Sequence, residues 1–222
     1  DVGLTEKGEA EAKNAGELIN NENINIDLVF TSVLKRAINT MNICLSNMGY
    51  NNPEIIQDWR LNERHYGSLQ GLNKSETAEK YGDDQVLIWR RSYSTPPPRL
   101  DLNDERHPKF DSLYKNLDEN DLPDSECLAD TVDRFLPYWH NQIKEDILDN
   151  KKVLIVAHGN SLRALVKFLN NVSDENILKY NIPTGAPLVF ELDKNLNPIK
   201  DYYFFHCLFT ANLKLRNNPQ KL

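Results

Sequence analysis

The fold class is decided by the segment Val153-Leu154-Ile155-Val156-Ala157-His158-Gly159-Asn160-Ser161. Its first five residues form a continuous apolar run, which is typical of a strand covered on both faces in a parallel sheet. From Ser161 onward, apolar side chains recur at helical spacing as far as Leu169, which predicts a helix. His158 therefore lies where a buried strand gives way to a helix, and ligands bind at such places in open parallel sheets.

The rest of the chain repeats this alternation of strands and helices. Residues 26–30 predict a strand, a helix follows from about Leu34, and an earlier helix begins after Thr5, which suits the N-cap position. Further helices are predicted over residues 74–81, 84–91 and 128–147, and late strands over 188–192 and 199–205. Pro137 predicts a kink or an early break within 128–147. The pattern indicates an α/β fold with a doubly wound, mostly parallel sheet and helices on both faces.

Residues 93–126 interrupt this pattern. The segment contains five prolines, which exclude regular helix, and polar residues fill the gaps between them. We interpret it as an irregular insertion, either a lid over a site or a partly ordered loop in solvent. Residues 1–205 are predicted to form a single α/β domain, and residues 206–222 a divergent C-terminal tail.

Composition narrows the class of protein. The net charge of −7 argues against a nucleic-acid binder, so binding of an anion would require locally focused positive charge. Three widely separated cysteines without a CxxC pair argue against a disulfide framework and a zinc site, and for a reducing compartment. No apolar run approaches membrane-spanning length, so no membrane partner is expected. These features predict a cytoplasmic protein.

At the ends of two predicted strands lie residues whose side chains could bind a phosphate group. After the strand at 153–157, His158 and Gly159 precede a helix whose first N–H groups attract anions, and an imidazole there could donate hydrogen bonds to a phosphoryl group. After the strand at 26–30, Arg36 falls in the first turns of a helix, and guanidinium binds phosphate in a bidentate manner. Taken singly, a histidine at a strand–helix turn is more often a capping or core residue.

Two further segments add to this set. Within residues 61–74, Glu63 is predicted to act as a general acid and base, and Tyr66 and Lys74 to contact substrate. Arg90 and Arg91 adjoin the insertion. Adjacent arginines usually form a solvated face, but this position suits a clamp for a carboxylate or a phosphate.

The motifs TSVLKRA, RLNERHYGSLQGLNK, WRR, AHGNSLRALVK and NIPTG follow one another along the chain. In order and spacing, from DVGLTEKG to about Tyr203, the sequence resembles the cofactor-dependent phosphoglycerate mutases of the histidine phosphatase superfamily. The resemblance implies a glycolytic and gluconeogenic isomerase that interconverts 3-phosphoglycerate and 2-phosphoglycerate through a phosphohistidine. It also implies priming by 2,3-bisphosphoglycerate, no metal, and a homodimer or homotetramer.

The resemblance also implies residue roles. His158 stabilises the phosphoryl group in transfer, Arg36 contacts that group, and Glu63 exchanges protons with the substrate hydroxyls. Substrate binding is expected of Arg36, Glu63, Tyr66, Lys74, Arg90, Arg91, Gly159 and Asn160. Arginines and imidazoles supply the positive field in place of a metal.

The chain departs from the family pattern in its first strand. The family's phosphorylated histidine lies in an Arg-His-Gly motif upstream of the position that matches Asp1. None of His65, His107, His140 and His206 follows a strand into a glycine-rich turn. In the family, the missing strand lies beside the one that ends at His158, and its loss would cost about 5–10 kcal/mol. We therefore expect the nucleophilic histidine to lie upstream of Asp1. The apolar stretch at 204–209 also departs from the family's charged tail, so no role is carried over there.

Alternatives stay open at this point. One is a bisphosphoglycerate mutase or a phosphatase on the same scaffold. The Arg90–Arg91 pair and the GLNK segment argue against a phosphatase, whereas the choice between the two mutases stays open because residues near the family's first motif influence it. Another is a catalytically inactive protein that binds phosphoglycerates. The intact Arg36, Glu63 and His158 argue against it.

Overall fold

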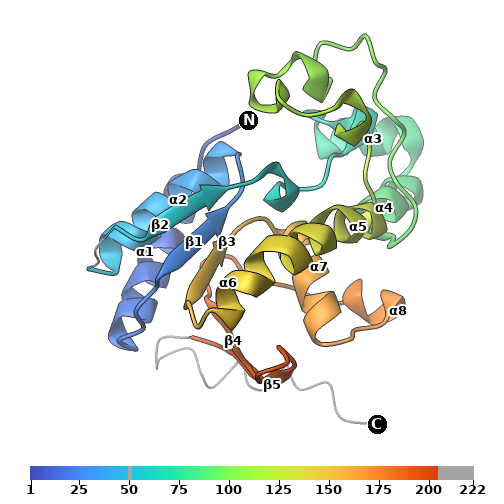
Figure 1. Cartoon of the computed structure of the whole chain (residues 1–222). Coiled ribbons are helices and arrows are strands. Elements are labelled where there is room, and N and C mark those ends of the chain that lie inside the picture. Colours follow the sequence, from blue (N-terminus) through green and yellow to red (C-terminus); the bar gives the residue numbers. More distant parts are fainter. Residues whose placement is uncertain (50–51, 205–222) are drawn as a thin grey trace.

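The computed structural model describes residues 1–49 and 52–204 (Figure 1). Its centre is a three-stranded parallel sheet in the order β2-β1-β3, made of β1 (Leu28–Thr31), β2 (Glu54–Gln57) and β3 (Val153–Val156). In register, Phe30 of β1 is paired with Ile56 on one side and Ile155 on the other. The predicted α/β fold with a parallel sheet is confirmed.

Helices cover both faces of this sheet (Figure 1). On one face lie α1 (Glu6–Asn21) and α2 (Lys35–Asn47), and on the other lie α5 (Leu128–Tyr138), α6 (Lys144–Leu148) and α7 (Gly159–Leu169). The alternation of side chains along β1 explains the two layers, because Val29 packs with Met41 of α2, whereas Leu28 and Phe30 join the core cluster that contains Phe135 of α5.

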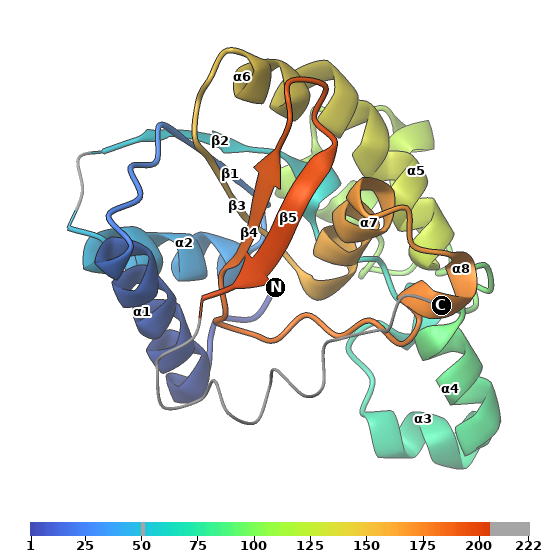
Figure 2. The same cartoon turned by 90° about the horizontal axis from the view of Figure 1, so that it is seen from below.

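A second, two-stranded sheet pairs β4 (Leu188–Leu192) with β5 (Pro198–Tyr203) in antiparallel fashion. Figure 2 shows this hairpin beside β3, and Leu154 and Val189 pack against the same core cluster. Within the described residues, β3 pairs with β1 alone and β4 with β5 alone. The facing edges of β3 and β4 thus have no strand between them in the described part of the chain.

Local signals in the sequence account for several element boundaries. The Thr5 hydroxyl accepts a hydrogen bond from the Gly8 N–H at 3.1 Å and caps α1, as predicted. The expected break at Pro137 is also confirmed, since α5 ends at Tyr138 and the turn Trp139–Ile143 has π-helical hydrogen bonding before α6 begins. Helix α7 begins at Gly159, two residues before the predicted start, so its first N–H groups lie directly beside His158.

Residues 93–126 contain three short 3-10 turns, Pro108–Phe110, Ser112–Tyr114 and Glu119–Asp121, and no α-helix or strand. Before this segment lie α3 (Lys74–Tyr81) and α4 (Asp83–Arg91). The short strand β2 and the single turn α8 (Asp174–Ile177) were not predicted. The predicted tail at 206–222 lies outside the described residues. No helix in the described part is long and apolar enough to cross a membrane.

Candidate active site

Two polar side chains meet at the carboxyl ends of adjacent strands. Ser32 follows β1 and His158 follows β3, and these strands pair in parallel with Thr31 opposite Val156. As a result, Ser32 Oγ and His158 Nε2 lie 2.8 Å apart in a buried hydrogen bond. The Leu34 N–H donates to the same Ser32 oxygen at 3.2 Å. Ser161 accepts from the His158 N–H at 3.1 Å, which fixes the backbone on the other side of the imidazole.

His158 is a neutral imidazole at pH 7. Its exposed fraction is 8%. Burial lowers the pKa of His158 to about 4, Glu63 opposes this change, and the positive charges of Arg36 and Arg134 add to it. A neutral ring that donates a hydrogen bond suits stabilisation of a phosphoryl oxygen. Arg36, the second residue of α2, is exposed and lies close enough to His158 to affect its pKa.

Glu63 is held at one of its two carboxylate oxygens. Its Oε1 accepts hydrogen bonds from the Arg64 N–H at 2.9 Å and from Asn160 Nδ2 at 2.5 Å. Among the hydrogen bonds of the described residues, none reaches Oε2. The carboxylate is therefore oriented through Oε1, and Oε2 has no hydrogen-bond partner among the described residues.

An ion pair supports the segment that contains Glu63, and sequence reasoning missed it. Arg134 and Glu126 are both buried, with Nε to Oε1 at 2.6 Å. Arg134 also donates to the carbonyl oxygens of Arg60 (2.7 Å) and Asn62 (3.3 Å), while Glu126 accepts from the His65 N–H at 2.7 Å. These bonds hold the backbone on both sides of Glu63.

Asn62 connects this segment with its neighbours. Its Oδ1 accepts from the Val33 N–H at 3.2 Å, next to Ser32, and its Nδ2 donates to the Tyr114 hydroxyl at 2.8 Å. Tyr114 belongs to the irregular segment 93–126. The insertion thus contacts a residue adjacent to Glu63, which either of its two sequence-based interpretations would allow.

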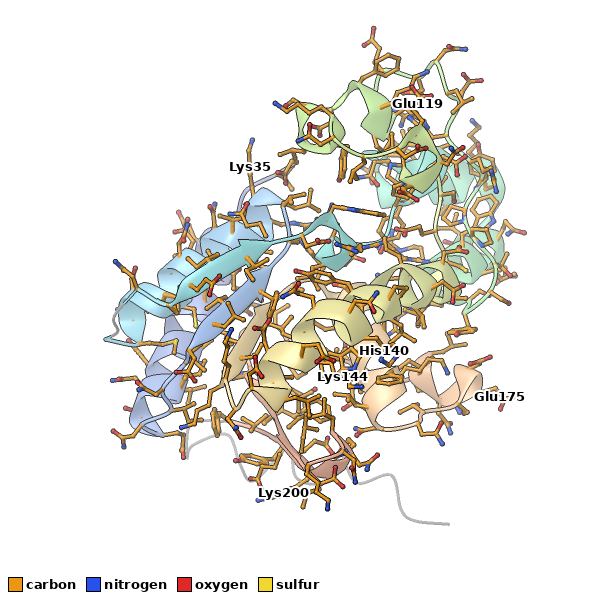
Figure 3. All side chains as sticks on the ribbon, viewed as in Figure 1. Lys35, Glu119, His140, Lys144, Glu175 and Lys200 are labelled. Atoms are coloured by element: carbon orange, nitrogen blue, oxygen red, sulfur yellow. The ribbon has the colours of Figure 1, made fainter. Side chains whose placement is uncertain are left out.

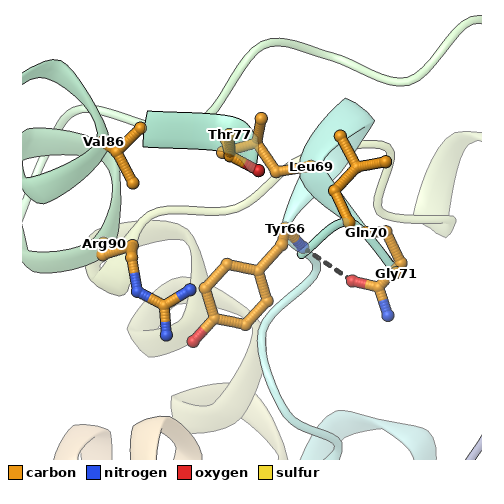
Figure 4. A pocket seen from close by; sticks show the side chains of 8 residues that line it. Tyr66, Leu69, Gln70, Gly71, Thr77, Val86 and Arg90 are labelled. Carbon is orange, nitrogen blue, oxygen red and sulfur yellow. Dashed lines mark hydrogen bonds between the residues drawn. The ribbon is translucent and has the colours of Figure 1, made fainter. Parts of the chain in front are cut away.

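Arginines surround Tyr66. The guanidinium of Arg64 lies over its ring at 4.6 Å and that of Arg90 at 5.6 Å from the ring centroid. Tyr66 and Arg90 also line a cavity of about 190 Å³ with Gly71 and Thr77 (Figure 4). Arg64 is 3% exposed, donates to the carbonyl oxygens of Trp89 and Arg90 at 3.0 Å, and leaves Nε without a partner among the described residues.

A further arginine, Arg163 of α7, adjoins Asn160. Its Nη1 donates to Asn160 Oδ1 at 3.2 Å and its Nη2 to the Ile177 carbonyl oxygen at 2.6 Å. Burial lowers the pKa of Arg163, and the positive charges of Arg91 and Arg64 lower it further. No carboxylate of the described residues forms a salt bridge with Arg163 or Arg64.

Comparisons with known proteins identify the family of this chain. The family model of the histidine phosphatase superfamily (branch 1) matches residues 1–105 and 99–203. The 2,3-bisphosphoglycerate-dependent phosphoglycerate mutases of Borreliella burgdorferi strain ZS7 and Borreliella afzelii strain PKo are 57% and 58% identical over 203 residues, which are 91% of this chain and 82% of each relative. The chain belongs to this mutase family within the histidine phosphatase superfamily.

Solved structures show that the histidine phosphatase fold extends well beyond close sequence relatives. A mycobacterial glucosyl-3-phosphoglycerate phosphatase has a TM-score of 0.63 at 20% identity, over 91% of this chain and 85% of its own. The α-ribazole phosphatase of Shigella flexneri has a TM-score of 0.61 at 18% identity, over 89% and 82% of the two chains. At these identities the likeness concerns the fold alone.

In this histidine phosphatase chain, the structure brings Arg36, Glu63, Asn160 and His158 together at the strand ends. Tyr66 and Arg90 are joined to them through Arg64, and Arg91 through Arg163. A Cβ built at Gly159 would meet nothing within 4 Å, so the backbone there is open to a ligand. Lys74 is the first residue of α3, but its side chain lies outside the described part.

Sequence reasoning did not select Ser32, Arg64, Arg134 or Arg163. All four lie in or beside the quoted family motifs or on a predicted helix, yet their partners are backbone carbonyls or residues distant in sequence. His140 is exposed on the outer helical layer, where its ring packs against Phe168 (Figure 3). Among the described residues, no group of three His, Cys, Asp or Glu side chains could hold a metal.

Proposed function

We propose that this chain is the catalytic part of a glycolytic 2,3-bisphosphoglycerate-dependent phosphoglycerate mutase, an isomerase that interconverts 3-phosphoglycerate and 2-phosphoglycerate. The observation that carries the proposal is a carboxylate, Glu63, with one free oxygen beside the neutral imidazole of His158, among arginines that lack carboxylate partners. The mutases of 57% identity have the same activity in their names.

Each residue has a role that its chemistry supports. Glu63 Oε2 takes the proton from the substrate hydroxyl that receives the phosphoryl group and returns a proton in the reverse step. His158 and Arg36 stabilise the oxygens of the group in transfer. Substrate phosphate and carboxylate bind to Tyr66, Lys74, Arg90, Arg91, Gly159 and Asn160.

The nucleophile in this proposal is a histidine on a strand upstream of Asp1, located between β3 and β4. Both facing edges are unpaired within the described residues, and β3 ends at His158. A parallel strand beside β3 would place its carboxyl end next to the imidazole. The phosphoryl group would pass from that histidine to the free hydroxyl of the substrate, and the phosphoryl group on the other hydroxyl would then pass to the histidine, which is thereby reloaded.

The described residues fit the proposed primer. Arg64 and Arg163 each have a buried Nε without a hydrogen-bond partner among the described residues. The positive charge of Arg91 is close enough to lower the pKa of Arg163. Such unneutralised positive charge suits a polyanion with two phosphates and a carboxylate. When bound, 2,3-bisphosphoglycerate supplies the phosphoryl group that loads the histidine. We further propose that no metal takes part, that the protein is cytoplasmic, and that it forms a homodimer or homotetramer.

An assay of the full-length protein tests this function. With 3-phosphoglycerate as substrate, we expect formation of 2-phosphoglycerate that depends on added 2,3-bisphosphoglycerate and is unaffected by EDTA, since cationic side chains supply the electrostatics. Activity abolished by EDTA and restored by manganese would contradict the metal-free mechanism. Release of inorganic phosphate as the main product would instead indicate a phosphatase.

A further inference from the structure

Arg163, considered above only for its positive charge, ends a series of hydrogen bonds that reaches Glu63. The Ile177 carbonyl oxygen at the end of α8 accepts from Nη2, and Nη1 donates to Asn160 Oδ1. Asn160 Nδ2 in turn donates to Glu63 Oε1. The three side chains come from α7 and from the irregular segment between the 3-10 turns Trp59–Leu61 and Gly67–Leu69, which are far apart in sequence.

The side-chain amide of Asn160 gives this series of hydrogen bonds a fixed donor-to-acceptor order. Asn160 has one acceptor oxygen and one donor nitrogen at nearly equal positions. With Arg163 on one side and a carboxylate on the other, one orientation forms two charge-assisted hydrogen bonds. The flipped amide would face a donor toward the guanidinium and an acceptor toward the carboxylate, and both contacts would be repulsive. Arg163 therefore selects the orientation in which Nδ2 points to Glu63.

Charge explains why an arginine is needed at this position. Arg163 forms no salt bridge with a carboxylate of the described residues, so its nearest polar contact on this side is the amide oxygen of Asn160, beyond which lies Glu63. Its second bond, to the Ile177 carbonyl at 2.6 Å, fixes the guanidinium in place. The nearby Arg91 and Arg64 lower the pKa of Arg163, which still stays protonated at neutral pH.

We propose that Arg163 is a positioning residue: it holds the Asn160 amide in the orientation that fixes Glu63 through Oε1 and leaves Oε2 for the substrate. The proposal rests on the proposed function, since Glu63 is taken there as the general acid and base. Without Arg163, Asn160 would rotate more freely, and Glu63 would spend less time in the productive geometry.

Lys167, one turn further along α7, provides a matched control. Its Nζ donates to the Val172 carbonyl oxygen at 2.7 Å and pairs with Asp174 at 2.7 Å. Lys167 thus anchors the same connection between α7 and α8 as Arg163, but it forms no hydrogen bond with Asn160 in the described structure. Arg163→Met and Lys167→Met should therefore lower the melting temperature to a similar extent, while only the first changes the geometry of Glu63.

Kinetics of the full-length enzyme form the first part of the test. We expect Arg163→Met to lower kcat about tenfold with KM changed less than about threefold, and Lys167→Met to leave kcat unchanged. Arg163→Met combined with Asn160→Ala should be no slower than Asn160→Ala alone, because Arg163 acts through Asn160. Additive effects, or a raised KM with kcat kept, would make Arg163 a direct substrate ligand and overturn the proposal.

NMR of the Asn160 side-chain amide forms the second part and does not depend on activity. A short bond to a carboxylate should give one amide proton a downfield shift and slow exchange, which Arg163→Met should abolish and Lys167→Met preserve. An unchanged signal in Arg163→Met overturns the positioning role. If the unaltered protein showed no mutase turnover, the proposed function would fail, while the amide signal would still decide whether Arg163 orients Asn160.

Discussion

Two groups of arginine near Glu63 differ in how their charge is balanced. In one group, Arg134 forms an ion pair with Glu126 and donates to backbone carbonyls. In the other group, Arg64 and Arg163 donate to carbonyls and to an amide, and no carboxylate of the described residues forms a salt bridge with them. The first group is paired, and the second retains its positive charge.

This difference in charge balance suggests different roles: the paired group supports the fold, and the unpaired group has positive charge available for an anion. A buried charge is costly unless it is paired, so an unpaired cation implies that something else provides the balance. In a protein with a net charge of −7, carboxylates are plentiful, yet none forms a salt bridge with Arg163 within the described structure. An anionic substrate bound nearby would balance the charge of this second group without a direct bond to Arg163, whereas the Arg134–Glu126 pair needs no ligand.

The largest effect is expected from breaking the paired group. Arg134→Met leaves Glu126 buried without its partner and removes donors from the carbonyls of Arg60 and Asn62. We expect a loss of about 3–5 kcal/mol in the free energy of unfolding, measured by urea denaturation. The control is Lys151→Met, because the pair of Lys151 with Asp146 is partly exposed and should contribute less than about 1 kcal/mol. Equal losses in the two variants would mean that Arg134 does not support the Glu63 segment.

The two groups also show how far sequence reasoning extends. Apolar runs and spacing predicted β3, β4, α3 and the break at Pro137, because these features depend on neighbouring residues. The four-residue strand β2 has too little pattern to be distinguished from a loop. Nothing in the sequence distinguishes Arg134 from Arg163, since both lie on amphipathic helices. Their difference arises from which carbonyls and carboxylates the tertiary fold places beside them.

A second prediction concerns His158, whose pKa is affected by burial, by Glu63, and by the positive charges of Arg36 and Arg134. Burial lowers its pKa to about 4, below the value of about 6.5 expected in the unfolded chain. The unfolded state therefore binds more protons between these values, and stability falls as the pH drops from about 6.5 to about 4. The contribution amounts to about 3 kcal/mol at most.

Urea denaturation at pH 7 and at pH 5 measures this effect. His158→Asn should reduce the loss of stability between the two pH values, because the asparagine does not titrate. His140→Gln is the control, as His140 is exposed and should leave the loss unchanged. A parent protein and a His158→Asn variant with equal pH dependence would show that His158 does not reside in the folded state as a neutral, buried imidazole.

The smallest of the three effects concerns Glu63. It compares the carboxylate near the unpaired arginines, Glu63, with the carboxylate paired with Arg134, Glu126. In Glu63→Gln, the amide oxygen can still accept from Asn160 and from the Arg64 N–H, so the two bonds at Oε1 are kept. The amide nitrogen replaces Oε2 and cannot take a proton from the substrate. We expect kcat to fall about a hundredfold, which corresponds to a rise of about 2.7 kcal/mol in activation free energy, with KM and the melting temperature nearly unchanged.

Glu126→Gln should show the opposite pattern, a large drop in melting temperature, because it breaks the buried pair with Arg134. If Glu63 merely anchored its neighbours, Glu63→Gln would instead lower the melting temperature or raise KM while kcat was largely kept. Measurement of kcat, KM and melting temperature on both variants decides whether the carboxylate beside the unpaired arginines serves the reaction and the one beside Arg134 serves the fold.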